Sequence, residues 1–142
     1  MGYLALTVAA LFTGAAFYIN FAEQPARLKL EDQALLTQWK TAYARGFAMQ
    51  ATLAVLGFLL GAIAWWQTGR PAFLAGAFLM LANWPWTLIA MMPTNKTLMA
   101  TDPDKAGAET RALIVKWNGL HLVRSLLGAL AVVCFLFAVS PA

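Results

Sequence analysis

The segment from Trp117 to Val139 reads WNGLHLVRSLLGALAVVCFLFAV and decides the fold class. No charged residue follows Arg124 in it. A helix needs about 20 mainly apolar residues to cross the hydrocarbon core of a bilayer. The segment therefore predicts a transmembrane helix, and the chain's only histidine, His121, lies together with Arg124 just inside its first turns.

The rest of the chain has a matching composition. Of its 142 residues, 61% are hydrophobic and 11% are charged, whereas soluble domains have about 45–50% and about 25%. Three further blocks without charge predict three more spans. We therefore predict an all-α fold, a single membrane domain over residues 1–142 built as an antiparallel four-transmembrane-helix bundle. The predicted transmembrane helices cover about residues 3–22, 46–67, 71–92 and 118–139.

The connection between the first two spans predicts an interfacial helix over about residues 28–45. Apolar residues recur there at helical spacing. Its Trp39 and Tyr43 are residue types that concentrate at the headgroup level of a membrane. The next connection is a tight turn around Gly69 and Pro71, which makes the second and third spans antiparallel neighbours.

The placement of positive charge predicts the topology. The formal net charge is +4, and eight of the ten Lys and Arg residues lie in the two long connections or at their edges, against one, Arg70, on the opposite side. The positive-inside rule then places the long connections in the cytoplasm and both termini outside, and we expect a bacterial inner membrane. No concentrated basic stripe of the kind that binds nucleic acid occurs, so the expected partners are the lipid bilayer and a lipophilic small molecule.

Small residues predict how the helices pack. Gly57 and Gly61 form a GxxxG motif, which allows close approach of two helices in lipid. We expect intramolecular packing, with oligomerisation through the Gly57/Gly61 face as the alternative. Pro85 predicts a kink in the third span, and Asn83 lies near its middle.

Polar side chains gather on one side of the predicted membrane. Because the helices alternate in direction, the end of the first, the start of the second, the end of the third and the start of the fourth meet at one face. Ionisable residues within a span are costly, so they tend to pair or to line a cavity. We expect Glu23 to pair with Arg124 beside His121. Taken singly, each residue also has a structural explanation: Arg124 can snorkel to the interface, and Trp117 can be an ordinary interfacial residue.

The residue inventory limits the chemistry. One histidine excludes bis-histidine haem ligation within the chain, and one cysteine, Cys134, excludes a paired thiol centre. A zinc site normally takes three or four protein ligands, whereas His121 and Glu23 supply two. We therefore predict no cofactor and no metal site, while a metal ion held through His121 stays open.

The chemistry that this residue inventory still allows is general-base catalysis in an apolar pocket. Histidine, with an ordinary pKa of about 6.5, can accept a proton at physiological pH, and cationic and amide groups can stabilise an oxyanion. Tryptophan and tyrosine supply flat walls for an aromatic ligand. The predicted catalytic residues are His121, Arg124 and Glu23. The predicted substrate-binding residues are Asn20, Asn83, Asn95, Trp39, Tyr43, Arg45, Trp84, Trp86 and Trp117.

Four stretches resemble the anthrone oxygenase-like family of small four-helix membrane proteins: YINFAEQPARL, WKTAYARGFAMQA, LANWPWTLIAMMPTNKTLMA and KWNGLHLVRSLLG. The similarity covers nearly the whole chain. It implies a four-helix bundle, and fungal members are implicated in oxidising polyketide anthrones to anthraquinones with O2 and no evident cofactor. The positions that match the family pattern are Asn20, Glu23, Pro25, Trp39, Arg45, Asn83, Pro93, Asn95, Trp117, His121 and Arg124.

Two functions follow as hypotheses. The first is a cofactor-independent oxygenase, in the manner of an anthrone oxygenase-like monooxygenase, acting on a lipophilic phenolic, anthrone-like or quinone-like molecule. The second is a non-catalytic membrane protein that binds a lipid or small molecule or assists a partner complex. Transport is a third alternative, and it requires access from both faces.

Overall fold

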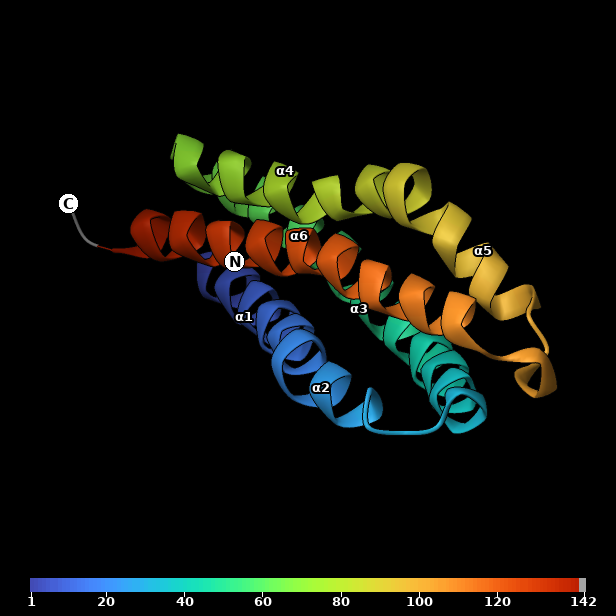
Figure 1. Cartoon of the computed structure of the whole chain (residues 1–142). Helices are drawn as coiled ribbons and strands as arrows, with labels where there is room; N and C mark the ends of the chain where they lie inside the picture. Colours follow the sequence, from blue (N-terminus) through green and yellow to red (C-terminus); the bar gives the residue numbers. More distant parts are fainter. Residues whose placement is uncertain (141–142) are drawn as a thin grey trace.

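Four rods of helix make up the chain in the computed structural model, which describes residues 1–140 (Figure 1). The first and third rods each contain one π-helical turn, and a single 3-10 turn lies in the last connection. In chain order the elements are α1 (Gly2–Tyr18), η1 (Ile19–Glu23), α2 (Gln24–Arg27), α3 (Asp32–Thr68), α4 (Pro71–Trp86), η2 (Thr87–Met91), α5 (Met92–Ala100), η3 (Pro103–Lys105) and α6 (Ala108–Val139).

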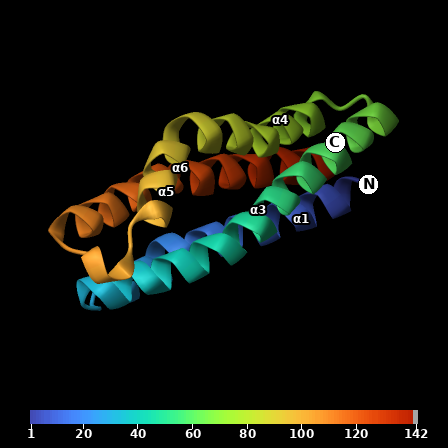
Figure 2. The same ribbon diagram turned by 90° about the vertical axis from the view of Figure 1, so that its right-hand side faces the viewer.

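All four rods are long and apolar enough to cross a membrane, which confirms the predicted all-α four-helix architecture. The rods are antiparallel: the start of α1, the end of α6 and the α3–α4 turn lie at one end, and the two longer connections lie at the other (Figure 2). The rod of α1 packs on α3 and α6, and α4 packs on the same two helices. We call the end with the longer connections the polar end and the opposite end the apolar end.

The helix predicted between the first two spans is not a separate element. It begins at Asp32 and continues without a break to Thr68 as α3. No glycine or proline that would end a helix stands between Trp39 and the second span except Gly46, and that residue is tolerated within the helix. As a result, the side chains of the connection and of the second span share one continuous helical face.

The core of the apolar end depends on close contact between aromatic rings and glycines. A Cβ atom added at Gly76 would lie 2.5 Å from Phe135, and one at Gly61 would lie 2.8 Å from the same ring. Gly57 likewise leaves room for Met80, since a Cβ atom there would lie 2.8 Å from the end of that side chain. The chain's own α4 and α6 therefore cover the face that carries Gly57 and Gly61.

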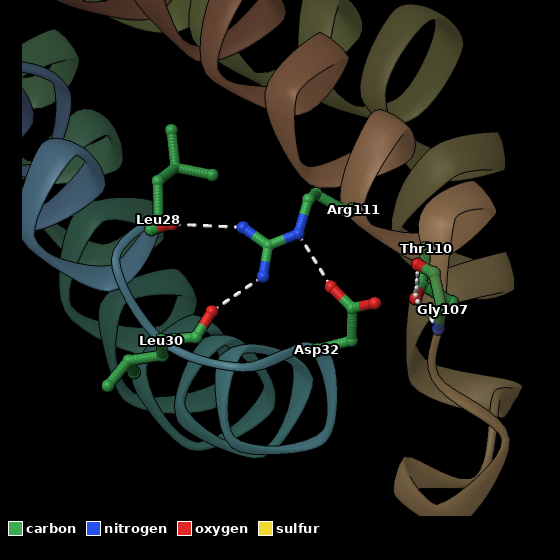
Figure 3. A network of polar contacts seen from close by, with 6 residues as sticks. All are labelled: Leu28, Leu30, Asp32, Gly107, Thr110 and Arg111. Carbon is green, nitrogen blue, oxygen red and sulfur yellow. Dashed lines mark hydrogen bonds and ion pairs between the residues drawn. The ribbon is translucent and has the colours of Figure 1, made fainter.

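Arg111 ties the two long connections together at the polar end (Figure 3). Its guanidinium donates to the backbone oxygens of Leu28 and Leu30 and to the carboxylate of Asp32. Beside it, Thr110 caps the start of α6, because its hydroxyl accepts from the Gly107 N–H at 2.9 Å. These contacts hold the beginnings of α3 and α6 next to each other.

Candidate active site

A cavity lies inside the bundle toward the polar end. Its empty volume, which includes space open to the surroundings, is about 380 Å³. All four rods contribute to its wall. The lining residues are Ile19, Glu23, Arg27, Ala42, Tyr43, Gly46, Phe47, Gln50, Met91, Asn95, Trp117, His121 and Arg124.

Two π-helical turns shape the wall of this cavity. Both η1 and η2 end two residues before a proline, Pro25 in one rod and Pro93 in the other. A proline lacks an N–H and crowds the carbonyl four residues before it. In both turns the next residue donates its N–H to the carbonyl five residues earlier, which widens the helix there. Each turn carries a buried residue beside or in the cavity, Asn20 in η1 and Met91 in η2.

Asn20 is the centre of the polar contacts next to the cavity. Its Nδ2 donates to the backbone oxygen of Asn118 at 3.0 Å and to the side-chain oxygen of the same residue at 2.7 Å. Because a carbonyl oxygen can only accept, these bonds fix which end of the Asn20 amide is nitrogen. The amide oxygen of Asn20 therefore faces Ser125 Oγ, 2.7 Å away, and His121 Nδ1, 2.9 Å away.

This arrangement selects the tautomer of His121. An amide oxygen cannot donate, so the hydrogen of the Asn20–His121 bond is on Nδ1 of the imidazole. In a neutral imidazole Nε2 then carries the lone pair. No residue from 1 to 140 hydrogen-bonds to Nε2, and His121 lines the cavity although it is only 1% exposed. The free lone pair is thus available to a ligand as a base.

Aromatic rings form one wall of the site. The rings of Trp117 and His121 stack with centroids 4.8 Å apart, and Trp117 Nε1 donates to Asn95 Oδ1 at 2.9 Å. Trp39 stacks on Tyr43 at 4.9 Å and meets Trp117 edge to face at 5.7 Å. The flat surfaces of four predicted site residues, Trp39, Tyr43, Trp117 and His121, therefore lie together, with Trp39 buried behind the lining residues.

The expected ion pair between Glu23 and Arg124 is wrong. Glu23 Oε1 instead accepts from Arg27 Nη2 at 2.7 Å and from Gln38 Nε2 at 2.9 Å. The reason is local: the first rod continues as a helix through Pro25, so Arg27 stands one turn after Glu23 on the same face. Glu23 still lines the cavity, as part of this pair.

Arg124 is left without a counter-ion. Arg124 is only 6% exposed, and no carboxylate within residues 1–140 lies in salt-bridge range of it. Its guanidinium carbon lies 5.6 Å from the centroid of the Phe12 ring, a cation–π contact. Because a buried unpaired charge is costly, this position favours a ligand that carries a negative or developing negative charge.

Other buried polar groups of the lining also lack partners among the described residues. Neither side-chain polar atom of Gln50 is hydrogen-bonded, and neither are Asn95 Nδ2 and Arg124 Nε. Buried polar groups are nearly always hydrogen-bonded in proteins, so each exception needs an explanation. All three residues line the same cavity. The cavity therefore presents donors and acceptors that a bound molecule can use.

Four predicted site residues lie elsewhere. Arg45 is exposed on the outside of α3, because its side chain points away from the face that carries Tyr43. Trp86 donates its Nε1 to the Leu120 carbonyl at 2.9 Å and lines no cavity described here. Asn83 and Trp84 line a second, smaller cavity nearer the middle of the bundle's length.

Sequence reasoning missed part of the polar cluster. It assigned none of Arg27, Gln50, Asn118 and Ser125 to the site. A signal was present, because Asn118, His121 and Ser125 follow one another at spacings of three and four residues along one helical face. These short polar residues were obscured by the apolar residues that surround them in α6.

Comparison with known proteins identifies the family. The family model described as anthrone oxygenase matches residues 39–134. The chain belongs to this family. Its relatives include an anthrone oxygenase from Claviceps purpurea, with 33% identity over 87% of this chain and 79% of the relative.

Two further fungal relatives agree with this assignment. Anthrone oxygenase AgnL2 from Paecilomyces divaricatus is 30% identical over 87% of this chain and 85% of its own length. Anthrone oxygenase tpcL from Aspergillus fumigatus is 31% identical over 86% of this chain and 82% of its own length. No solved structure matches the chain. The family model's match covers the lining residues of the second, third and fourth rods.

Proposed function

We propose that this chain is a membrane-bound oxygenase that converts a ring methylene of a lipophilic, hydroxylated aromatic compound of the anthrone type into a ketone. The relatives named as anthrone oxygenases support the reaction class. The cavity beside His121 supports a mechanism in which the protein supplies a base and an anion site. O2 is the co-substrate.

The reaction begins with proton removal. Nε2 of His121 accepts a proton from the ring methylene, which is acidic because the resulting carbanion is delocalised onto the ring oxygen as an enolate. The guanidinium of Arg124 stabilises that oxyanion in a water-poor cavity, where a fixed charge has its greatest effect. The amide of Asn95, whose Nδ2 has no partner among residues 1–140, is a second donor.

Oxygen then adds to the carbon. The carbanion gives its electrons to O2, a carbon–oxygen bond forms, and the protonated His121 returns its proton to the peroxide. Loss of water from the hydroperoxide leaves the ketone. The net change is one methylene and one O2 consumed, with one carbonyl and one water formed.

The observation that carries this proposal is the bond between Asn20 Oδ1 and His121 Nδ1 at 2.9 Å. It holds the imidazole in the tautomer that leaves Nε2 unprotonated, which a general base requires. The neighbouring Arg124 adds no stability to the fold, because its buried charge has no counter-ion within the described chain. A catalytic role gives a reason for this residue.

We also propose a topology. The polar end carries eight of the ten basic residues, so the positive-inside rule places it in the cytoplasm of a bacterial inner membrane, with both termini on the other side. The cavity would then open near the inner leaflet. A reporter that is active only outside the cytoplasm, fused to the C-terminus, is expected to be active, and an inactive fusion would reverse this assignment.

Turnover of an anthrone tests the function. Membranes containing the chain are given 1,8-dihydroxyanthrone, and anthraquinone formation and O2 uptake are measured against membranes without the chain. His121→Ala is expected to lower the protein-dependent rate by about 10²–10⁴, the usual contribution of a general base. Lys116→Ala, an exposed position on the same helix, is the matched control and should keep the full rate.

Three outcomes would reject the proposal. One is a folded His121→Ala protein with unchanged turnover, which would make the polar cluster structural. Another is a wild-type chain that binds the anthrone but does not accelerate its oxidation, which would favour a non-catalytic binding protein. A third is O2 uptake that differs from one molecule per ketone formed.

A further inference from the structure

Three hollows lie in series between the outside of the bundle and His121. The first is an outer groove lined by Ala48, Ala51, Thr52, Val55, Leu56 and Trp84. The second, a middle cavity with about 280 Å³ of empty volume including space open to the surroundings, is lined by Phe47, Ala51, Ala54, Asn83, Trp84, Thr87, Leu88 and Arg124. The third is the His121 cavity described above.

Each hollow shares residues with the next. The outer groove and the middle cavity have Ala51 and Trp84 in common, and the middle cavity and the His121 cavity have Phe47 and Arg124 in common. Small residues make the series possible. Ala48, Ala51 and Ala54 recur every third residue along α3 and leave space beside α4.

The outer groove is apolar. None of its lining residues is charged; Leu56 of the groove and Leu88 of the middle cavity are 42% and 52% exposed. In a rod that is apolar enough to span a membrane, these side chains meet hydrocarbon rather than water. The groove therefore opens sideways toward lipid.

The middle cavity is apolar but carries a few unpaired polar atoms. Asn83 is 1% exposed, and its Oδ1 has no hydrogen-bond partner within residues 1–140; the same holds for Trp84 Nε1 and Arg124 Nε. One acceptor and two donors in otherwise apolar walls match a flat aromatic molecule that bears both hydroxyl and carbonyl groups. An acyl chain would leave all three atoms unpaired.

We propose that the gap between α3 and α4 is the lateral entrance through which a hydroxylated aromatic molecule moves from the bilayer to His121. The middle cavity is its waiting site, and Phe47 is the side chain that divides the waiting site from the reaction site. The proposal rests on the proposed function for its ligand class, and it assigns Asn83 and Trp84 to entry rather than to catalysis.

Binding kinetics of a product-like probe test the entrance without requiring turnover. The association rate of 1,8-dihydroxyanthraquinone is measured by stopped-flow quenching of tryptophan fluorescence, with the full chain in lipid vesicles. Ala51→Phe, which fills the shared wall of groove and cavity, is expected to slow association about tenfold, within the one to three decades over which on-rates of related complexes vary. Dissociation should slow in parallel, leaving the equilibrium affinity largely unchanged.

Two further variants keep the test decisive. Leu88→Phe narrows the middle cavity from its exposed side, so it should slow association even if Ala51→Phe does not fold. Ala75→Phe, on the exposed side of α4 and absent from the linings of all three hollows, is the matched control and should bind at the wild-type rate.

The outcomes separate the two proposals. Slowed association without any anthrone turnover would support the entrance and reject the oxygenase. Wild-type association rates in both Ala51→Phe and Leu88→Phe would reject the entrance alone. Equal slowing in Ala75→Phe would also reject it. A wild-type chain that binds no dihydroxyanthraquinone would reject the entrance and the proposed ligand class together.

Discussion

The two ends of the bundle are built from the same four rods but use their interiors differently. At the apolar end the ring of Phe135 fills the space left by Gly61 and Gly76, and a single added carbon atom at either glycine would collide with it. At the polar end the rods enclose a cavity whose buried polar atoms are only partly paired. The contrast indicates that the apolar end holds the rods together, and the polar end holds the groups that we propose to react.

The polar end is the less stable of the two ends, because it contains a buried charge without a counter-ion. A fully satisfied cluster would have placed a carboxylate beside Arg124, yet Glu23 is bonded to Arg27. Sites that bind or react commonly retain such unfavourable features, and substitutions that remove them often raise stability and lower activity. The two ends should therefore respond in opposite ways to mutation.

The largest effect on stability is expected at the apolar end. Phe135→Ala removes a buried ring that contacts two glycines and should lower the free energy of unfolding by about 3 kcal/mol, the low end of the range for phenylalanine, because lipid is itself apolar. Phe137→Ala, two residues along α6 and 77% exposed, is the matched control.

Thermal unfolding in lipid nanodiscs measures both variants. The anthrone turnover per folded molecule should stay at the wild-type level in each. If Phe135→Ala instead abolished turnover in the folded fraction, the two ends would be coupled, and the division of labour between them would be incorrect.

At the polar end, Asn20→Leu tests whether Asn20 sets the tautomer of His121. Removing the amide oxygen frees Nδ1 of His121, so the tautomer with a basic Nε2 is no longer favoured, and turnover should fall about 10- to 100-fold, equivalent to about 1.4–2.7 kcal/mol. Nitrogen NMR of the chain's single histidine reports the tautomer directly. An unchanged tautomer together with a full loss of turnover would show that Asn20 acts in another way.

Much of the architecture could be predicted from the sequence, because a bilayer imposes length and apolarity on every span. The four uncharged blocks predict the rods, and the alternation of direction predicts that polar ends meet. Asn20 and His121, which are 101 positions apart, were placed at the same face on this basis, and they are hydrogen-bonded. The constraint of the membrane thus provided long-range information that a soluble helical sequence lacks.

Pairing within the site was harder to predict. Opposite charges in a span usually pair, which favours Arg124 as the partner of Glu23, and a proline such as Pro25 gives no indication that the first rod continues to Arg27. The π-helical turn η1 lets it continue. A π-helical turn has no sequence pattern as clear as the period of an α-helix, so neither η1 nor η2 could be foreseen.

A smaller and opposite effect is expected for Arg124→Met. The substitution replaces a buried cation that lacks a counter-ion in the described chain with an apolar side chain of similar length. It should raise the free energy of unfolding by about 1–2 kcal/mol while lowering anthrone turnover. Arg124→Lys keeps the charge and should show no gain in stability. A destabilised Arg124→Met protein would mean that the guanidinium is stabilised where it lies.

The smallest effect is expected for Arg45, which matches the family pattern and yet is exposed on the outside of α3. If the inner face alone carries the chemistry, Arg45→Ala should change the stability by less than about 0.5 kcal/mol and leave turnover within a factor of two. Tyr43→Phe, two residues away on the cavity side, provides the comparison and should alter binding of the dihydroxyanthraquinone. A tenfold loss of turnover in Arg45→Ala at unchanged stability would place a functional contact on the outer surface of the polar end. The division between a reactive interior and an inert exterior would then be incorrect.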